Sequence, residues 1–370
     1  MRGVCLLVSA VFACATPAVA GSLTPPGAPA PTMKSLDQVE PRVPIGPLTT
    51  PGDADSVYKI TQPGSYYLTG NLFGSSGKYG IEIATGNVTV DLGGFLVSGG
   101  SGSLDGVRAS TTFPNLVVHS GTVIGWSGDG VDLSLSSVSL VRDVISRLNG
   151  GYGIFVGGQS EVRDCTVATC SLDGIRAEGR SVITDCVASY NNGDGIDPES
   201  RSVVTACVAS NNNGYGIRGG AYNTIVDCTA SSNGVDGISG GIACTIRNNT
   251  AGDNGAYGVR VSSGSIVRLN TCAGNGRTTV AGGIAATGSD NRIELNHCTG
   301  SDYGIIAFSG GNGIFGNTAS GNSAASWNFA AGNFFGALVD REFAATAGYA
   351  GDGGINSTLG TTDPYANVTY

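Results

Sequence analysis

Side chains suited to binding sugars flank a glycine that recurs along the sequence, always followed by Ile or Val. Tyrosine rings offer a surface on which sugars stack, and guanidinium groups and carboxylates bond to hydroxyls or uronates. We expect the residues just before this glycine, and two positions after it, to form one exposed band that binds polysaccharide. The candidate residues are Arg108, Asp129, Asp132, Tyr152, Asp173, Arg176, Asp194, Asp197, Tyr215, Arg218, Tyr257 and Arg260.

The same residues also allow a structural interpretation. Asp-Gly and Tyr-Gly pairs suit turns, and opposite charges on neighbouring strands pair with each other. The motifs GDGVD (128–132) and GDGID (193–197) could instead supply calcium with carboxylates from Asp129, Asp132, Asp194 and Asp197. Flanking arginines would compete with that ion, and the nonapeptide calcium repeat is absent. We therefore expect no cofactor, with calcium as an open alternative.

Signatures of known catalytic and metal sites are missing from the sequence. No CxxC pair suggests zinc, and His119 and His297 stand in no motif that we can align. Asp143, Asp164, Asp185 and Asp227 form a partial acidic column, which we expect to face solvent or to accept backbone hydrogen bonds. The sequence leaves open whether the protein is an enzyme.

The spacing of the recurrent glycine predicts the architecture that holds these residues. Five successive intervals between Gly153 and Gly258 are each 21 residues long, which is typical of a solenoid. Each period contains three short strand-like pieces, and their contour fits one turn of a three-faced β-helix whose coils lie about 4.8 Å apart. We expect an all-β, single-stranded right-handed parallel β-helix of about eleven coils.

Two aliphatic columns should point inward, one directly after the glycine and one running from Val162 to Ile314. Three residues after each member of the second column comes a residue that we expect at an inward bend. There an Asn can bond to the Asn of the next coil, and Cys fills a similar volume. This structural ladder consists of Cys165, Cys186, Cys207, Cys228, Asn249, Asn270, Asn296 and Asn317. Because stacked side chains point alike, we favour free thiols over disulfides.

The remaining segments differ in composition. Residues 1–20 have the pattern of a signal peptide, with Arg2, an apolar run and cleavage near Ala20, which predicts a secreted protein. Residues 21–56 are rich in proline and suit an extended arm. The β-helix with its N-terminal cap should span 57–322, and 323–370 should form a C-terminal cap and polar tail, with Trp327 and Phe343 among its aromatic residues.

Charge and hydropathy exclude some partners. The chain carries a net charge of −9, and its 19 Lys and Arg residues are scattered, so nucleic acid is an unfavourable partner. After the signal peptide no apolar run is long enough for a membrane span. The sequence does not indicate an oligomeric state.

The coil motif N-x-x-x-x-N-x-x-x-G-I resembles that of the right-handed parallel β-helix proteins of the pectin-lyase-like superfamily, over residues 80–322. The segments ITQPGSYYLTGNL, VTVDLGGF and TDPYANVTY resemble more narrowly a set of secreted, multi-copy β-helix proteins of planctomycete-type bacteria, for which no reaction is established. The resemblance implies the fold and export. It does not imply an activity, because many functions share this scaffold.

We expect noncatalytic binding of extracellular polysaccharide, or a surface-layer role, through the Arg/Asp/Tyr face. One alternative is a polysaccharide lyase, glycoside hydrolase or epimerase acting on acidic glycans. Another is an adhesin or protein-interaction scaffold.

Overall fold

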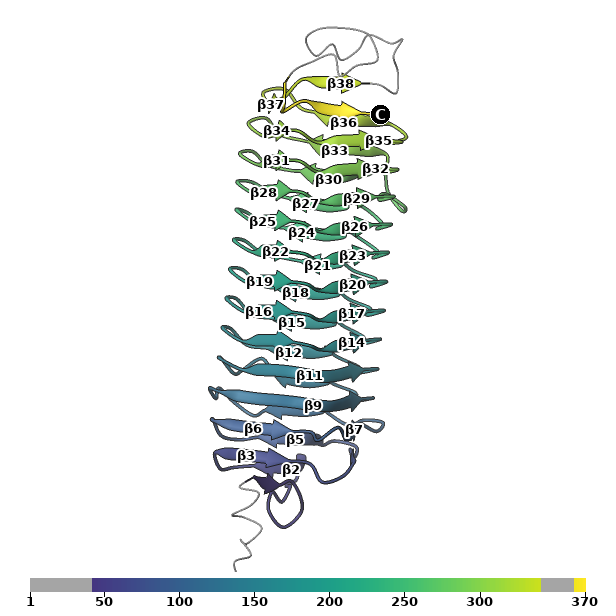
Figure 1. Ribbon diagram of the computed structural model, residues 1–370. Coiled ribbons are helices and arrows are strands. Elements are labelled where there is room, and N and C mark those ends of the chain that lie inside the picture. Colours follow the sequence, from purple (N-terminus) through teal and green to yellow (C-terminus); the bar gives the residue numbers. More distant parts are fainter. Residues whose placement is uncertain (1–41, 341–362) are drawn as a thin grey trace, which may run out of the picture. The chain divides into compact units, whose positions relative to one another are not determined.

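The protein consists of stacked coils, each built from three short strands (Figure 1). The computed structural model describes residues 42–340 and 363–370. Within these residues the named strands pair in parallel with their equivalents in neighbouring coils, as in the pairing of Ile175 with Ile154 and Ile196. The expected all-β, right-handed parallel β-helix is therefore confirmed. The expected signal peptide, most of the expected arm, and Phe343 lie outside the described residues.

One sheet contributes a strand to each coil and contains 13 strands. Its strands are β2 (Ser56–Ile60), β5 (Tyr79–Ile83), β8 (Val107–Ala109), β10 (Val131–Leu133), β12 (Ile154–Val156), β15 (Ile175–Ala177), β18 (Ile196–Pro198), β21 (Ile217–Arg218), β24 (Ile238–Gly240), β27 (Val259–Val261), β30 (Gly282–Ala286), β33 (Tyr303–Ala307) and β36 (Ala325–Phe329). The expectation of about eleven coils was too low, because β2 and β36 form coils that lack the recurrent glycine.

The second sheet has 26 strands in two columns. The long strands β9 (Leu116–Ile124) and β11 (Leu140–Arg147) pass through the bend between the columns and join them. The first column contains β1 (Val43–Pro44), β3 (Gly64–Tyr67), β6 (Val88–Asp91), β13 (Glu161–Arg163), β16 (Val182–Thr184), β19 (Val203–Thr205), β22 (Thr224–Val226), β25 (Thr245–Arg247), β28 (Ile266–Arg268), β31 (Arg292–Glu294), β34 (Gly313–Phe315) and β37 (Phe334–Phe335).

The second column contains β4 (Leu72–Phe73), β7 (Leu96–Ser98), β14 (Thr166–Ala168), β17 (Val187–Ser189), β20 (Val208–Ser210), β23 (Thr229–Ser231), β26 (Thr250–Gly252), β29 (Thr271–Ala273), β32 (His297–Thr299), β35 (Thr318–Ser320), β38 (Leu338–Asp340) and β39 (Asn367–Thr369). The C-terminal strand β39 pairs with both β35 and β38, so the end of the chain is a strand between two others rather than a free tail. At the other end, β1 pairs with β3 and lies within the segment where we expected an arm.

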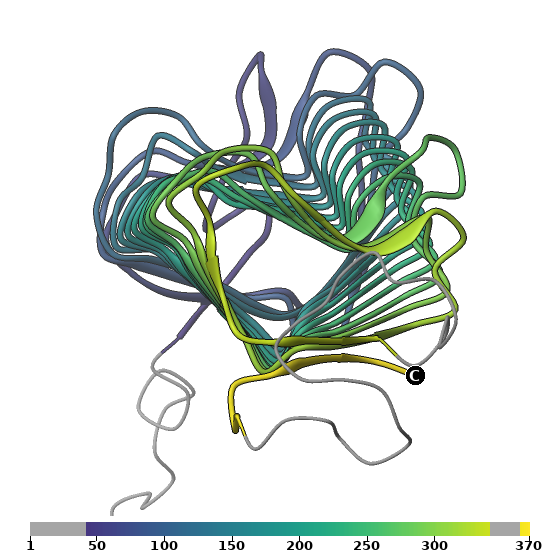
Figure 2. The same ribbon diagram turned by 90° about the horizontal axis from the view of Figure 1, so that it is seen from above.

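Aliphatic side chains fill the interior of the column, which is seen end-on in Figure 2. Both expected inward columns are fully buried; Ile183 and Ile196, for example, have no exposed surface. Equivalent residues of successive coils stack directly, because the register keeps each inward position over the same position of the coil below. The core is therefore continuous along the column.

Polar ladders occupy the bends, as the Asn/Cys column predicted. Asn249 accepts a hydrogen bond from the backbone N–H of Cys228 at 2.8 Å, and its Nδ2 donates to the carbonyl of Ile225 at 3.0 Å. In the same column the thiol of Cys207 points at the equivalent carbonyl, that of Ile183, at 3.7 Å. The thiol of one coil and the amide of another thus face backbone carbonyls at equivalent positions. The eight cysteines of the described residues are free and buried.

A third bend carries a ladder that our sequence analysis missed. The backbone N–H of Ser160 donates to the hydroxyl of Ser181, and that of Ser181 to Ser202. The ladder continues through Asn223 and Asn291. The signal was present, because serine recurs at 21-residue intervals from Ser139, but serine is too common in turns to stand out.

Candidate functional site

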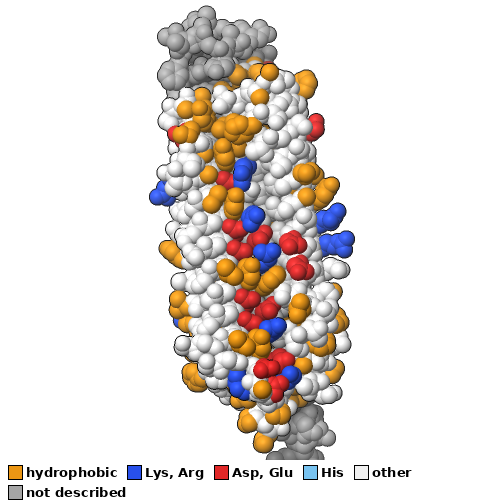
Figure 3. All heavy atoms as spheres, turned by 180° about the vertical axis from the view of Figure 1, so that it is seen from behind, with side chains coloured by type: hydrophobic (Ala, Val, Ile, Leu, Met, Phe, Trp, Pro, Cys, Tyr) orange, Lys and Arg blue, Asp and Glu red, His pale blue; other side chains and the backbone are white. Residues whose placement is uncertain are grey.

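The expected Arg/Asp/Tyr band lies on the outer face of the 13-stranded sheet. In the register of this sheet Asp132 lies between Arg108 and Phe155, and Arg176 lies between Phe155 and Asp197. Figure 3 shows charged side chains gathered along one face, parallel to the long axis. All twelve candidate residues therefore belong to one surface strip, which we call the band.

The aspartates that precede the recurrent glycine bond to the backbone of the next coil. Oδ1 of Asp129 accepts the N–H of Tyr152 at 2.6 Å, and Oδ1 of Asp194 accepts that of Tyr215 at 2.8 Å. Asp105, Asp173 and Asp236 likewise accept a backbone N–H from the coil that follows each of them. These carboxylates therefore have a structural role, as the turn interpretation anticipated in part. One oxygen of each is committed to the backbone, and the second oxygen of Asp236 is buried against Arg260.

Over four of these five aspartates, a second glycine in the next coil makes room for the carboxylate. A Cβ at Gly214 would lie 2.1 Å from Oδ1 of Asp194 in the coil below, closer than real Cβ atoms come to an oxygen. The motif therefore encodes a contact between coils as well as a turn. Ala256 takes the place of this glycine over Asp236, so the contact favours glycine but does not require it.

The arginines of the band pair with these acids and lie against tyrosine rings. Arg176 is 3.5 Å from Asp197, and its guanidinium lies 5.7 Å from the ring centre of Tyr152. Arg260 is 2.7 Å from Asp236 and donates to the hydroxyl of Tyr215 at 3.0 Å. A cation over the face of an aromatic ring is attracted to it, so these contacts hold both side chains in place.

Arg218 is the most exposed of these arginines, with 58% of its side chain accessible and an ion pair to Asp194 at 3.5 Å. Its guanidinium lies 5.6 Å from the ring centre of Tyr215. Much of its hydrogen-bonding capacity is directed at solvent, so it is available to a ligand.

Burial changes the acidity of the band. Burial raises the pKa of Asp129 to about 7, against the lowering effect of the hydrogen bond from Tyr152. Burial likewise raises the pKa of Asp197 to about 6, although the charge of Arg176 opposes it. The pKa values of Asp105, Asp194 and Asp236 are also raised by burial. Part of the formal negative charge of the band is therefore neutralised near neutral pH.

The acids that we considered for calcium do not form one group. Asp194 and Asp197 come together with Asp173, with one carboxylate oxygen from each lying within 4.8 Å of the others. Asp129 and Asp132 belong to coils further down the column. Of the six oxygens of these carboxylates, Oδ1 of Asp173 and Oδ1 of Asp194 already accept backbone N–H groups, and two arginines pair with the group. Calcium takes six to eight oxygens, so other ligands would have to complete such a site.

A groove opens on the band beside Tyr215. Its volume is about 280 Å³. The ring of Tyr215, the guanidinium groups of Arg218 and Arg260, and the hydroxyl-bearing Ser239 and Ser262 line it. Among the residues that the structure describes, no carboxylate lines the groove. It combines a ring, two cations and hydroxyl groups, which are the groups that hold a sugar. The two serines, Ser239 and Ser262, were not among our candidates, because serine is common in turns and on surfaces and so carries little signal.

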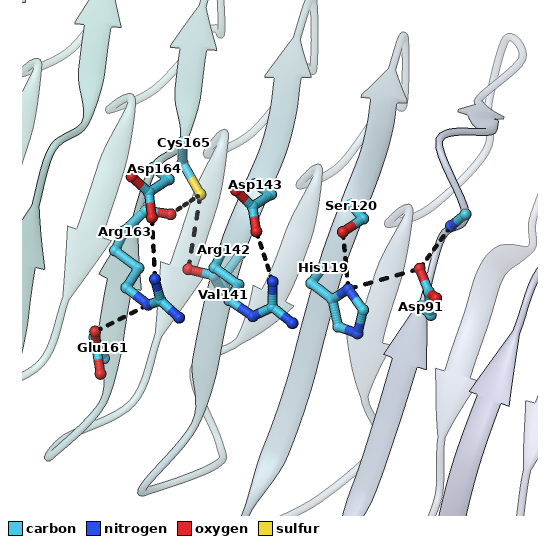
Figure 4. A network of polar contacts seen from close by, with 11 residues as sticks. Asp91, His119, Ser120, Val141, Arg142, Asp143, Glu161, Arg163, Asp164 and Cys165 are labelled. Carbon is cyan, nitrogen blue, oxygen red and sulfur yellow. Dashed lines mark hydrogen bonds and ion pairs between the residues drawn. The ribbon is translucent and has the colours of Figure 1, made fainter. Parts of the chain in front are cut away.

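His119 lies in a separate polar network on the 26-stranded sheet (Figure 4). Its Nδ1 is 2.9 Å from Oγ of Ser120 and 3.6 Å from Oδ1 of Asp91. Because one nitrogen faces both partners, the three residues do not form a relay in which the ring passes a proton between serine and acid. Burial lowers the pKa of His119, so its ring is neutral at pH 7.

Two aspartates of the acidic column beside this network pair with arginine, and Asp185 accepts a hydrogen bond from the hydroxyl of Thr184. Asp143 is 2.7 Å from Arg142, and Asp164 is 3.1 Å from Arg163. The two aspartates have left-handed backbone conformations, both with φ of 54°, which Asp tolerates better than most residues. Their position in a bend and their ion pairs account for Asp143 and Asp164 without a catalytic role.

The comparisons with known proteins agree with this fold. The family model described as "Right handed beta helix region" matches residues 152–299. The chain is a right-handed parallel β-helix, so the broader resemblance noted in the sequence is confirmed. The narrower one to planctomycete-type proteins stays a prediction. No curated protein matches the chain in sequence.

Two solved structures show how far the likeness extends. The A-module of mannuronan C-5 epimerase AlgE6 from Azotobacter vinelandii superposes with a TM-score of 0.57 at 18% identity, over 72% of this chain and 89% of that one. The A-module of AlgE4 from the same organism gives 0.55 at 18% identity, over 73% and 90%. At this identity the likeness concerns the fold alone. In the described residues, no helix is long and apolar enough to cross a membrane.

Proposed function

We propose that the protein binds an extended extracellular polysaccharide on the band and does not cleave it. The groove formed by Tyr215, Arg218 and Arg260 carries this proposal, because it places a ring beside two guanidinium groups in a space of about 280 Å³. A flat ring favours stacking of a pyranose, and the cations bond to its hydroxyls. The solved structures with the same fold are named as mannuronan epimerases, which supports a polysaccharide ligand.

The net charge of the band indicates whether neutral or acidic polysaccharides should bind more tightly. The band contains five aspartates and four arginines, and Asp105 and Asp236 of the same column add two more carboxyls. Like charges on the two sides of an interface weaken binding, so the net acidic band disfavours polyuronates. We therefore expect neutral polysaccharides to bind more tightly than polyuronates, although the groove itself would accept either.

The test is binding to an immobilised panel of xylan, soluble cellulose fragments, chitosan, mannuronan and polygalacturonate. Arg218→Ala should weaken the best interaction by about 10- to 100-fold, as expected for the loss of hydrogen bonds from a charged group. Arg247→Ala is the matched control, because Arg247 is exposed on the other sheet. No binding by the unmodified protein to any member of the panel would refute the proposal.

A second candidate function is that of an enzyme acting on acidic glycans. One observation favours it: Asp129, whose pKa is about 7, accepts a hydrogen bond from the backbone of Tyr152 and interacts with the charge of Arg108. A carboxyl with a near-neutral pKa is suited to exchange protons. Incubation with mannuronan and polygalacturonate, followed by assays for new reducing ends, unsaturated products and changed sugar stereochemistry, separates the two. Any such product that depends on Asp129 would favour the enzyme.

A further inference from the structure

Five tyrosines directly precede the recurrent glycine of the 13-stranded sheet, namely Tyr79, Tyr152, Tyr215, Tyr257 and Tyr303. The first three are three coils apart, and the last two follow at intervals of two coils. Tyr79, Tyr152 and Tyr215 each precede the recurrent glycine and occupy the same column of the 13-stranded sheet. Two coils with Asp at this position separate Tyr79 from Tyr152, and two more separate Tyr152 from Tyr215. Since coils are about 4.8 Å apart, neighbouring tyrosines of this series are about 14 Å apart.

Each of these tyrosines carries an arginine on its ring. The guanidinium of Arg108 lies 4.5 Å from the ring centre of Tyr79 and donates to its hydroxyl. That of Arg176 lies 5.7 Å from the ring centre of Tyr152 and donates to its hydroxyl at 3.4 Å.

The third pair has the same contacts, although its arginine comes from two coils further on. The guanidinium of Arg260 lies 5.7 Å from the ring centre of Tyr215 and donates to its hydroxyl at 3.0 Å. We call these three pairs the Tyr–Arg platforms.

Every platform is also fixed by an aspartate of the same column. Arg108 lies 3.6 Å from Asp105, Arg176 lies 4.0 Å from Asp173, and Arg260 lies 2.7 Å from Asp236. The same three contacts therefore recur in each platform: ring to guanidinium, guanidinium to hydroxyl, and guanidinium to carboxylate. The recurrence of all three contacts, at tyrosines three coils apart, distinguishes these platforms from Tyr257, whose ring lies against Phe308 instead.

We propose that the three Tyr–Arg platforms bind one polysaccharide chain that runs parallel to the solenoid axis, each contacting a residue three sugars further along the chain. The inference rests on the proposed function and adds the direction, length and unbranched character of the ligand. One pyranose of an extended β-1,4-linked chain is about as long as the rise between coils. Such a chain contacts successive platforms with every third ring.

Linking these weak contacts produces steps in affinity with chain length. Once a chain reaches a second platform, that contact becomes intramolecular, with an effective concentration in the millimolar range. From the coil spacing, a chain of about four residues spans two platforms and one of about seven residues spans all three. Shorter chains occupy one platform at a time.

The experiment measures calorimetric affinity for xylo-oligosaccharides of two to nine residues, with oligomannuronates of the same lengths as the acidic arm. We expect gains of at least tenfold at about four and again at about seven residues. The neutral series should bind more tightly than the acidic one. A smooth, small gain per added residue in both series would overturn the inference and leave the proposed function standing, whereas no binding in either series would overturn both.

Removal of the central platform gives a second, sharper readout. In Tyr152→Ala the remaining platforms at Tyr79 and Tyr215 are six coils apart, so the first step should move from about four to about seven residues. Tyr190→Ala is the matched control, because Tyr190 is exposed but lies on the other sheet, next to β17. An unchanged first step in Tyr152→Ala, with a normal circular dichroism spectrum, would overturn the inference.

A coil deletion changes the spacing and leaves every platform in place. Removal of residues 182–202 joins Ser181 to Val203, and in the intact chain Val203 follows Ser202 at the equivalent place of the next coil. Tyr152 and Tyr215 are then two coils apart, so a new step should appear at about three residues. Failure of that step to appear in the folded deletion protein would contradict the axial direction of the chain.

Discussion

The ladder of bends gives the most direct quantitative test of what stabilises this fold. Asn249 and Cys207 occupy equivalent positions in different coils, so alanine at either site removes a side chain from the same environment. In Asn249→Ala the N–H of Cys228 and the carbonyl of Ile225 lose partners at 2.8 and 3.0 Å. An unsatisfied buried group costs about 1–3 kcal/mol, so we expect a loss of about 4 kcal/mol in the free energy of unfolding.

In Cys207→Ala the loss should be much smaller. The thiol lies 3.7 Å from the carbonyl of Ile183 and 3.2 Å from that of Thr205, and sulfur makes only weak hydrogen bonds. What is lost is mainly one buried, polarisable atom and the contacts that it makes, at about 1–2 kcal/mol. The two variants should therefore differ by about 2–3 kcal/mol.

Urea denaturation followed by circular dichroism measures the difference, with native-state hydrogen exchange as the local probe. The amide of Cys228 should exchange faster in Asn249→Ala, because its acceptor is gone. Neighbouring coils of a solenoid can unfold separately, so the exchange data also show whether the effect stays near the bend. Equal destabilisation by the two substitutions, with the amide of Cys228 still protected, would refute the claim that the ladder acts through its hydrogen bonds.

Three other predictions concern the glycines, the acids and the C-terminal strand. Gly195→Ala should destabilise by about 1–3 kcal/mol, because its Cβ would lie 2.7 Å from the carbonyl of Gly216, whereas Gly70→Ala, in open space, should be neutral in thermal unfolding. Since the folded pKa of Asp129 is raised, the folded state binds more protons than the unfolded state between pH 3.8 and about 7, so stability falls as pH rises through that window. Asp129→Asn should reduce that slope in urea titrations at several pH values. Asn367→Ala should expose the amide of Asn317 to exchange, because Oδ1 of Asn367 accepts it at 3.0 Å.

The fold could be predicted because every coil repeats the same constraint. Small errors in assigning one coil do not matter when the glycine, the aliphatic residue and the Asn/Cys position recur at 21 residues. The ends were harder, since β1, β36 and β39 lack this motif and are held by pairing to a neighbour already in place. Strand formation there depends on pairing with a neighbouring strand, and a local sequence pattern does not reveal that pairing.

The band was predicted as a surface, but its chemistry was only partly visible. Alternation along the strand is enough to turn Arg176 and Arg218 outward. The bond from Asp194 to the backbone of Tyr215 is different, because it joins residues 21 apart through a gap left by Gly214. The three-coil spacing of the Tyr–Arg platforms was also hidden, because the intervals in the N-terminal coils are longer than 21 residues and the arginines come from different coils.

The alternation of Tyr and Asp on the band follows from two competing needs. An Asp before the recurrent glycine accepts the N–H of the next coil and so strengthens the stack at every position where it occurs. A tyrosine there has its oxygen at the far end of the ring, so it supplies the ring but forgoes that bond. A tyrosine in every coil would therefore weaken the stack, and an aspartate in every coil would leave no surface for sugars. Two aspartates for each tyrosine, as between Tyr79 and Tyr215, keep most of the bonds and still repeat the ring at an interval that a regular polymer can match. The double substitution Tyr152→Asp with Leu172→Gly reproduces the Asp and Gly of the next coils. It should accordingly raise the stability of the stack while abolishing the central platform, which separates the two needs in one protein.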